Sequence, residues 1–377
     1  MTLPQERPGY LLLENGTRFE GMFSGPAGGG CGELVFTTVL TGYQEVLTDP
    51  SFAGQLVVMT VPMIGVYGIH PRDDQAGRVW ASGLVVRHLT RPRPGRESSS
   101  LRGYLARNGV ATLVGADTRA LTRHIRDAGA MRALLAGREV SEREARERLL
   151  AEPLMQGRDL ATPASCLSAY EVAPAGRERG LVLCLDYGVK RRSLELIRAE
   201  GYRVRVMPAT SGIEDLLSAG ACGVFVSNGP GDPAAVPGAV ERVRALSDAG
   251  LPIFGICLGH QLVARAFGGR TFKLPYGHRG GNHPVKNLHT GSVEITSQNH
   301  GFAVVQAGDE VSDAPELVVT HRNLNDGTIE GIAHRERPVF AVQYHPESAP
   351  GPHDSRYLFE RFVDRMESRR DVDGTTR

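Results

Sequence analysis

The stretch from Pro252 to Gln261 constrains the fold of this chain more than any other part of the sequence. An apolar run is followed by Gly255, Cys257 and Gly259 in a Gly-x-Cys-x-Gly pattern, and then by residues suited to a helix. This is the pattern of a nucleophile elbow, a sharp strand-to-helix turn, with cysteine in place of serine. Such a turn strains the backbone, and flanking glycines avoid the clashes that larger side chains would cause. The sequence therefore predicts a strand, a tight turn at Cys257 and a helix.

An elbow would make the Cys257 thiol reactive. The thiol would lie at the N-terminus of the following helix, where the helix dipole and free N–H groups favour the thiolate. The backbone N–H of Leu258 would point into the same space and could stabilise an oxyanion. The total of five cysteines is odd and no two have C-x-x-C spacing, so we expect neither a disulfide framework nor a structural zinc site. For the other four cysteines we expect buried structural positions, the usual fate of free cysteine. These four are Cys31, Cys166, Cys184 and Cys222.

A cysteine nucleophile needs a base, and His345-Pro346-Glu347 supplies a candidate. The tripeptide follows the apolar run Val339–Gln343, so it would lie at the end of a strand, where the sites of α/β proteins gather. Residues two apart on an extended chain face the same way, so the imidazole and the carboxylate could lie side by side. Taken alone, the tripeptide is better explained by a surface turn. Together with the elbow, it predicts a Cys257–His345–Glu347 triad.

The loop Ser227–Pro233 follows another apolar run. Its glycines and prolines are typical of a simple turn, but its place after a parallel strand favours a loop whose backbone N–H groups contact substrate or complete an oxyanion hole. It lacks the G-x-x-x-x-G-K-[ST] pattern of a phosphate loop. The spacing of His278, His283 and His289 fits no common zinc pattern, so we expect no metal site there.

The length of 377 residues predicts two domains. Between residues 181 and 366, short apolar runs alternate with helical patterns, which predicts an α/β domain with a mostly parallel sheet flanked by helices. Residues 1–172 show strand patterns between glycine-rich turns and fewer helical patterns, which predicts an α+β domain. Residues 173–180 would be a linker and residues 367–377 a polar tail.

Composition excludes several classes of protein. Lys and Arg total 43 and Asp and Glu total 42, so the basic excess of a nucleic-acid binder is absent. No apolar run approaches the ~18 residues of a membrane span, and the N-terminus lacks a basic-then-apolar signal pattern. We therefore expect a cytoplasmic protein with neither a nucleic acid nor a membrane as partner.

These residues resemble a known family. Gly255–Gln261 with His345–Glu347 is similar to the class I (triad) glutamine amidotransferases, which specifies only the superfamily. Four further motifs resemble the small subunit of glutamine-dependent carbamoyl-phosphate synthetase, and with them the resemblance covers nearly the whole chain. They are Thr41–Ser51, Asp117–Arg123, Asn282–Lys286 and Ser297–Phe302.

The resemblance implies that Cys257 attacks the side-chain amide of glutamine, while His345, oriented by Glu347, handles the protons. Ammonia leaves, and water hydrolyses the glutamyl thioester to glutamate. By similarity, eight residues would contact L-glutamine or line the oxyanion region. They are Ser51, Gly229, Gly231, Leu258, Gln261, Asn299, Gly301 and Phe302.

The resemblance also implies a partner. Ammonia would pass to a separate large subunit, which uses ATP, a divalent metal and bicarbonate to make carbamoyl phosphate for arginine and pyrimidine biosynthesis. This chain would need no cofactor or metal of its own. Because the N-terminal domain has no site of its own that the residues define, we expect the chain to dock through this domain. The heterodimers could assemble into a higher oligomer.

Three other functions stay open. The first is an amidotransferase subunit of another synthetase, from which the N-terminal motifs distinguish this chain. The second is a catalytically dead interaction subunit, against which the intact Cys257, His345 and Glu347 argue. The third is a free-standing thiol hydrolase, for which about 170 residues without a site of their own would be unexpected.

Overall fold

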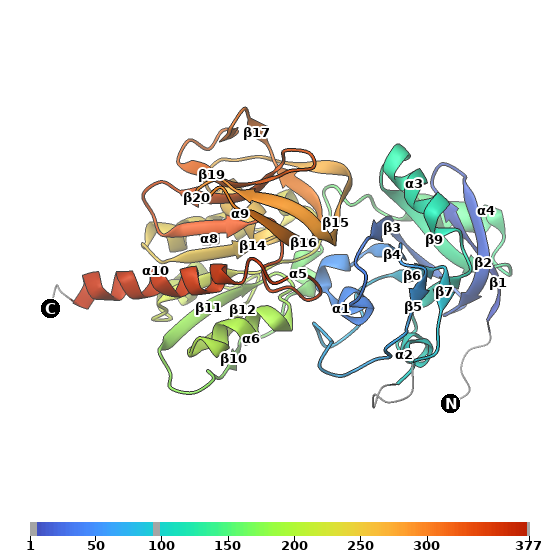
Figure 1. Ribbon diagram of the computed structural model, residues 1–377, viewed down its shortest axis with the longest axis horizontal. Coiled ribbons are helices and arrows are strands. Elements are labelled where there is room, and N and C mark those ends of the chain that lie inside the picture. Colours follow the sequence, from blue (N-terminus) through green and yellow to red (C-terminus); the bar gives the residue numbers. More distant parts are fainter. Residues whose placement is uncertain (1–5, 93–98, 375–377) are drawn as a thin grey trace. The chain divides into compact units, whose positions relative to one another are not determined.

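A computed structural model of the chain describes residues 6–92 and 99–374, with side chains up to residue 369. The chain forms two compact units (Figure 1). Unit 1 consists of Met1–Arg158 together with Pro275–Gly280, and unit 2 consists of Asp159–Leu274 and Gly281–Arg377.

Unit 1 is built around a closed barrel of seven strands among the described residues. In barrel order the strands are β1 (Arg7–Leu13), β2 (Arg18–Ser24), β8 (Ala111–Val114), β6 (Gly83–Val86), β4 (Gln55–Met59), β3 (Gly30–Thr37) and β9 (Met131–Gly137). Its helices are α1 (Tyr43–Thr48), η1 (Pro50–Phe52), α2 (Leu101–Arg107), α3 (Thr118–Ala128) and α4 (Glu142–Ala151), and the short strands β5 (Met63–Ile64) and β7 (His88–Leu89) pair with each other. Leu121 and Ile125 of α3 pack in one core cluster with barrel residues such as Leu34 and Leu56.

Unit 2 contains a ten-stranded sheet. In sheet order its strands are β10 (Tyr170–Val172), β12 (Tyr202–Pro208), β11 (Gly180–Asp186), β13 (Gly223–Val226), β14 (Ile253–Ile256), β21 (Val339–Val342), β20 (Ile329–His334), β19 (Leu317–Asn323), β15 (Thr271–Asn287) and β16 (Val293–Val304). The run from β12 to β21 is parallel, and β20 and β19 extend it in antiparallel fashion. A separate hairpin joins β17 (Gln306–Ala307) to β18 (Glu310–Val311). This arrangement confirms the predicted α/β class.

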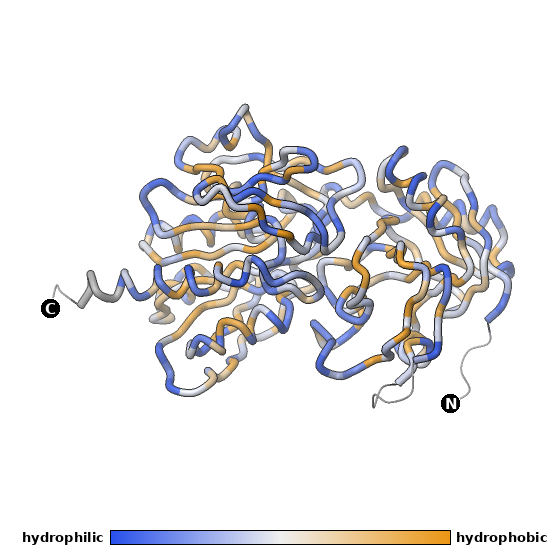
Figure 2. Tube along the Cα trace, in the orientation of Figure 1, coloured by the Kyte–Doolittle hydropathy of each residue, from blue (hydrophilic) through white to orange (hydrophobic). Residues whose placement is uncertain are grey.

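Helices cover both faces of this sheet. They are α5 (Ala161–Ala164), α6 (Arg191–Ala199), α7 (Ile213–Leu217), η2 (Pro233–Ala235), α8 (Ala239–Asp248), α9 (Leu258–Ala266) and α10 (Tyr357–Gly374). Alternate residues of β11 face opposite sides, as the period of a strand requires. Leu183 and Leu185 pack with residues of α8 and α9, whereas Val182 and Cys184 pack with residues of α6 and α10. The strands are accordingly among the most hydrophobic stretches of unit 2 (Figure 2).

The division into units differs from the predicted domains at three places. Unit 1 ends at Arg158 instead of residue 172, and the predicted linker 173–180 lies within unit 2. The reason is that Ala161 packs in a core cluster of unit 2 and β10 pairs with β12 of its sheet. Pro275–Gly280, inside β15, belongs to unit 1. The predicted polar tail begins inside α10, which continues to Gly374. Among the described residues, no helix is both long enough and apolar enough to span a membrane.

Candidate active site

The predicted elbow forms at the junction of β14 and α9. Cys257 has φ 55° and ψ −105°, a strained backbone for a residue other than glycine, and α9 begins at the next residue. A Cβ at Gly259 would lie 2.1 Å from the Val226 carbonyl oxygen, and one at Gly255 would lie 2.8 Å from the Gly259 backbone. Both positions therefore require glycine, because a side chain there would clash with the neighbouring backbone. Neither position has the positive φ that would favour glycine on backbone grounds.

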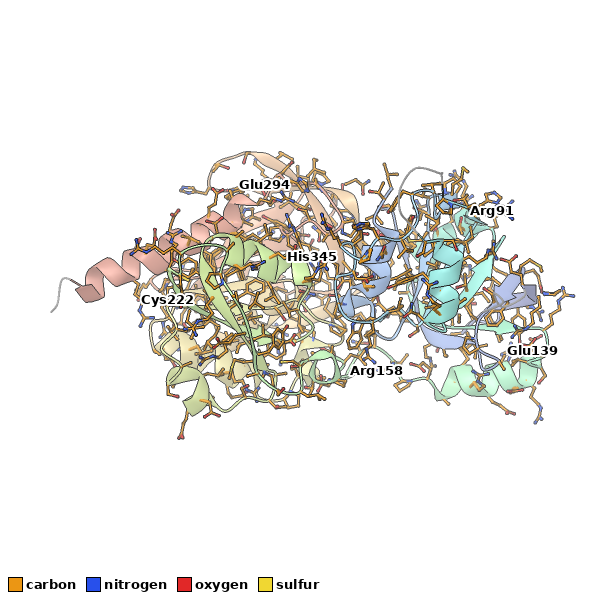
Figure 3. All side chains as sticks on the ribbon, turned by 90° about the horizontal axis from the view of Figure 1, so that it is seen from below. Arg91, Glu139, Arg158, Cys222, Glu294 and His345 are labelled. Carbon is orange, nitrogen blue, oxygen red and sulfur yellow. The ribbon has the colours of Figure 1, made fainter. Side chains whose placement is uncertain are left out.

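The structure brings the predicted triad together within unit 2. Strands β14 and β21 are parallel neighbours, so Cys257 and His345 both follow the carboxyl ends of adjacent strands. His345 Nδ1 donates to Glu347 Oε1 at 2.7 Å, and all three side chains are at most 2% exposed. His345, labelled in Figure 3, has no hydrogen-bond partner for Nε2 among the described residues. That nitrogen is available to exchange a proton with the thiol or with a substrate.

A buried lysine extends the triad. Lys190 Nζ lies 2.7 Å from Glu347 Oε1, and its side chain is 2% exposed. The sequence pattern does not single out this lysine, although its position indicates the right edge of the sheet: Lys190 comes four residues after Asp186, which ends the apolar run Leu181–Leu185. Because β11 belongs to the parallel part of the sheet, residues following it lie at the same carboxyl edge as Cys257.

The buried side chains of His345 and Glu347 stabilise each other in their charged forms, and Lys190 also stabilises the Glu347 carboxylate. Burial, the largest single effect, would lower the pKa of His345, but the Glu347 carboxylate and the Cys257 sulfur together outweigh it and raise that pKa to about 10. Burial would raise the pKa of Glu347, yet Lys190 and His345 hold it well below its usual range. Glu347 therefore remains an ionised carboxylate and bonds to both Lys190 and His345. Its bond to His345 fixes the orientation of the imidazole.

The Ser227–Pro233 loop lies beside the elbow. A Cβ at Gly229 would lie 2.1 Å from the Tyr187 carbonyl oxygen and 2.8 Å from Leu258 Cδ2, so only glycine fits there. Gly231 has φ 90° and forms an isolated bridge with Asp159. Leu258 is the first residue of α9, so its N–H belongs to the helix turn whose donors have no partner within the helix. The role of this N–H as an oxyanion donor stays a prediction.

The other predicted glutamine contacts fall into two groups. Asn299, Gly301 and Phe302 lie on β16, and the Cys257 thiol is 3.6 Å from the Asn299 carbonyl oxygen. Gln261 lies on α9 and donates to the Phe302 carbonyl oxygen at 2.8 Å, so its amide holds β16 beside the elbow. Ser51 belongs to η1 in unit 1, and its predicted contact with glutamine stays a prediction.

A chain of buried polar groups continues behind β16. His300 contacts the Phe302 carbonyl oxygen through Nδ1 and Gln298 Oε1 through Nε2, at 2.7 and 3.0 Å. Gln298 in turn donates to Glu330 on β20 at 2.9 Å. These groups fix the backbone of β16 where Asn299 to Phe302 pass the elbow.

The remaining cysteines have surroundings unlike those of Cys257. Burial raises the pKa of the Cys31 thiol to about 11 and that of Cys166 to about 12, and it raises that of Cys184 as well. The expectation of full burial holds only for Cys184, since Cys31, Cys166 and Cys222 are partly exposed. Cys31 lies near the start of β3, and Cys166 and Cys222 lie in loops. The number and spacing of the cysteines do not predict these positions.

A strand-elbow-helix cysteine with a histidine and a glutamate that follow the neighbouring strand defines the class of triad amidotransferases. In agreement, the family model described as glutamine amidotransferase class-I matches residues 183–365. A second model, described as carbamoyl-phosphate synthase small chain, CPSase domain, matches residues 11–135.

Curated relatives extend this similarity over nearly the whole chain. The carbamoyl phosphate synthase small chain of Chlorobaculum tepidum is 49% identical over 96% of this chain and 99% of its own length. Those of Syntrophotalea carbinolica and Symbiobacterium thermophilum are 46% and 48% identical, over 97% and 93% of this chain and 99% and 96% of their own lengths. The chain therefore belongs to the carbamoyl phosphate synthase small chain family.

Proposed function

We propose that this chain hydrolyses glutamine through a Cys257 thioester and delivers the ammonia to a large subunit that makes carbamoyl phosphate. The observation that carries the proposal is the buried Cys257–His345–Glu347 arrangement in a member of the small chain family. The relatives are named as small chains, which implies a large-chain partner.

The first half of the reaction forms the thioester. The Cys257 sulfur attacks the side-chain amide carbon of glutamine, and the carbonyl oxygen becomes an oxyanion next to the Leu258 N–H. Protonated His345 then gives a proton from Nε2 to the nitrogen that leaves as ammonia. Glu347 and Lys190 keep the imidazole oriented throughout, because Glu347 bonds to both cations.

The second half of the reaction releases glutamate. Neutral His345 takes a proton from water, which attacks the thioester carbon, and the Cys257 sulfur is the leaving group. No step needs a cofactor or metal in this chain. ATP and a divalent metal would act on the large subunit, with bicarbonate as the second substrate, and the product would serve arginine and pyrimidine biosynthesis in the cytoplasm. Heterodimers of the two subunits could assemble further.

The runner-up is an amidotransferase subunit of another synthetase. The match of residues 11–135 to the CPSase domain of small chains disfavours it, because that match lies outside the amidotransferase domain.

The test compares glutamine with ammonia as the nitrogen source for the complex. Cys257→Ser should lower glutamine-driven carbamoyl phosphate formation by at least ~1000-fold, since a serine hydroxyl is far less ionised than a thiol. Ammonia-driven formation should stay near the wild-type rate. Cys222→Ser, at a partly exposed cysteine of the same unit, is the matched control and should leave both rates unchanged. Loss of both activities in a folded, complexed Cys257→Ser protein would contradict the proposed role.

A further inference from the structure

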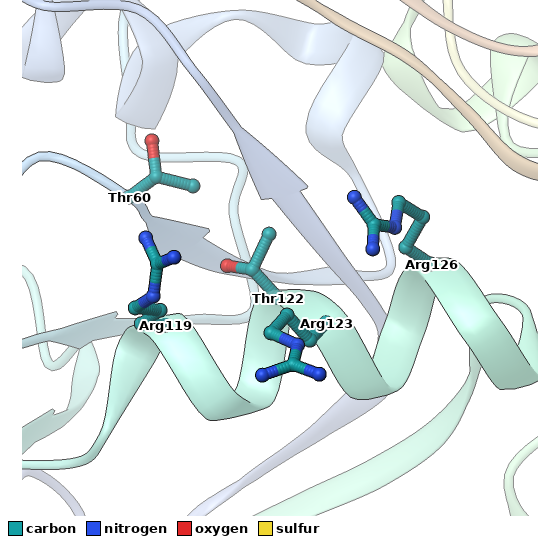
Figure 4. Close-up of a pocket in the computed structure, with 5 residues that line it drawn as sticks. All are labelled: Thr60, Arg119, Thr122, Arg123 and Arg126. Atoms are coloured by element: carbon teal, nitrogen blue, oxygen red, sulfur yellow. The ribbon is translucent and has the colours of Figure 1, made fainter.

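Helix α3 presents a row of arginines that the proposed chemistry does not use. Arg119, Arg123 and Arg126, together with Thr122 on the same helix and Thr60 after β4, line an open hollow of about 410 Å³ in unit 1. Figure 4 shows Arg119 beside Thr60 and Arg126 further along the helix. The same helix begins in a motif, Asp117–Arg123, that the sequence singled out and that the active site leaves unexplained.

The fold holds these arginines on the outer face of α3. Leu121 and Ile125 are fully buried in the core of unit 1, and Asp117 caps the helix by accepting from the Ala120 N–H. Residues at i, i+4 and i+7 lie on one face of a helix, so the three guanidinium groups share the side opposite the core. Over seven residues they extend about 10 Å along the helix axis.

The charge of this row is hardly compensated within the chain. Arg119 and Arg123 form no hydrogen bond or ion pair with any residue that the structure describes, and Arg126 has only its neighbour Asp127, at 3.5 Å. Helix α4 differs, since its Arg143 and Arg148 pair with glutamates one turn away. The whole chain has a net charge of only +1, so the row is a local concentration of charge.

Exposed apolar side chains follow the strands next to the hollow. Strands β3 and β4 are parallel and pair at Thr37 and Met59, so the residues that follow them lie at the same edge. Thr60 is one of these residues. Leu40 is 79% exposed and Met63 is 54% exposed. Arginine and methionine are both enriched at protein interfaces, and this edge of unit 1 carries both.

We propose that the arginine face of α3 binds an acidic surface of the large subunit, with carboxylates entering the hollow between Arg119, Arg123 and Arg126. This inference rests on the proposed function, because that function supplies the partner. A single small anion would engage one or two guanidinium groups, whereas a row about 10 Å long matches carboxylates spaced along a protein segment. The exposed apolar side chains Leu40 and Met63, which follow β3 and β4 and which a free anion would not use, favour the same partner.

The experiment measures the affinity of the full-length chain for the large subunit of the same organism. Arg123→Glu/Arg126→Glu should weaken the Kd at least ~30-fold, because two attractive charges become repulsive. The control is Arg143→Glu/Arg146→Glu on the exposed face of α4, which makes the same charge change and should alter the Kd by no more than ~3-fold. Raising the salt from about 50 to about 300 mM should weaken the wild type more than the α3 variant.

The outcomes separate this inference from the proposed function. Glutamine hydrolysis by the isolated α3 variant should match the wild type, which shows that the variant is folded. If the wild type binds and the α3 variant binds equally well, the inference is wrong and the proposed function stands. If the wild type fails to bind, both are wrong. If inorganic phosphate or ATP raises the Tm of the wild type but not of the α3 variant, while the Kd for the large subunit is unchanged, the hollow binds small anions and the inference is overturned.

Discussion

At the scale of single residues, the least expected feature is a lysine at the back of the triad. Moving a lysine and a glutamate out of water costs several kcal/mol, so such a pair persists only where each group compensates the other. Lys190 and Glu347 do so at 2.7 Å, and His345 is the third charge of the group. The lysine thus keeps Glu347 ionised even though the carboxylate is fully buried.

Lys190→Met is expected to lower kcat for glutamine ~10- to 100-fold, with a smaller change in KM, because Glu347 loses the cation that keeps it charged and oriented. Unfolding free energy should fall by about 3 kcal/mol, the usual cost of breaking a buried pair. Lys286→Met, at an exposed lysine of the same unit, is the control. Steady-state kinetics across pH would check this, and a variant with wild-type kcat at every pH would show that Lys190 has only a structural role.

The pKa of His345 predicts how stability depends on pH. Its folded-state pKa of about 10 lies above the ordinary value, so protonated His345 stabilises the fold fully below about pH 6.5 and loses this effect as the pH rises toward 10. The Tm of wild type should therefore exceed that of His345→Asn most at pH near 6, and the difference should shrink toward pH 10. Thermal unfolding at several pH values measures it. A constant or widening difference would refute the assignment.

Thiol labelling tests the choice of nucleophile. A glutamine-like electrophile should label Cys257 and leave the other cysteines largely unmodified, because burial raises the pKa of Cys31 to about 11 and of Cys166 to about 12. Near pH 8 these two thiols would hold only about 1 part in 1000 or less as thiolate. Peptide mapping by mass spectrometry identifies the labelled site. A label found mainly on Cys31 or Cys222 would contradict the assignment.

At the scale of elements, the elbow depends on how closely α9 approaches β13. Gly259 passes so near the carbonyl of Val226 that an added Cβ would lie 2.1 Å from its oxygen. Gly259→Ala should displace the start of α9, destabilise the chain by about 1–3 kcal/mol and lower kcat about 100-fold, since displacements near 1 Å have that effect. Gly77→Ala is the control, because a Cβ there meets nothing within 4 Å. Equal kcat for both variants would mean that the elbow tolerates movement.

The sequence predicted those parts of the fold and site that depend on local pattern. Apolar runs located β11, β13 and β14, and flanking glycines located the elbow at Cys257. The tripeptide His345-Pro346-Glu347 indicated a base and its orienting carboxylate, but not where they lie. The parallel pairing of β14 with β21 brings His345 to the same sheet edge as Cys257. Lys190 was not predicted because its place after an apolar run indicates only the edge of the sheet, while its partner, Glu347, is 157 residues away in the sequence. Strand β10 was not predicted because Tyr170 and Glu171 are exposed, so the sequence shows no apolar pattern there.

At the scale of the whole molecule, the two units are not consecutive pieces of chain. Pro275–Gly280 lies inside β15, yet it belongs to unit 1. Its backbone there accepts two hydrogen bonds, from the Ala130 N–H to the Pro275 oxygen at 2.7 Å and from the Thr38 N–H to the Arg279 oxygen at 3.2 Å. Tyr276 also stacks on Phe36, with ring centroids 6.2 Å apart. A cut at Arg158 would therefore leave unit 1 incomplete.

This incompleteness should be visible in hydrogen exchange. In a fragment of residues 1–158, the amides of Thr38 and Ala130 lose their acceptors and should exchange at least ~10-fold faster than in the full chain, because an N–H without a partner opens to water at little cost. The amide of Leu135 is the internal control, since β9 pairs with β1 and with β3, all within the fragment. If all three amides speed up together, the fragment is globally destabilised, and the ratio of Thr38 to Leu135 exchange still isolates the local effect. Equal protection of Thr38 and Ala130 in fragment and full chain would show that Pro275–Gly280 contributes nothing to unit 1.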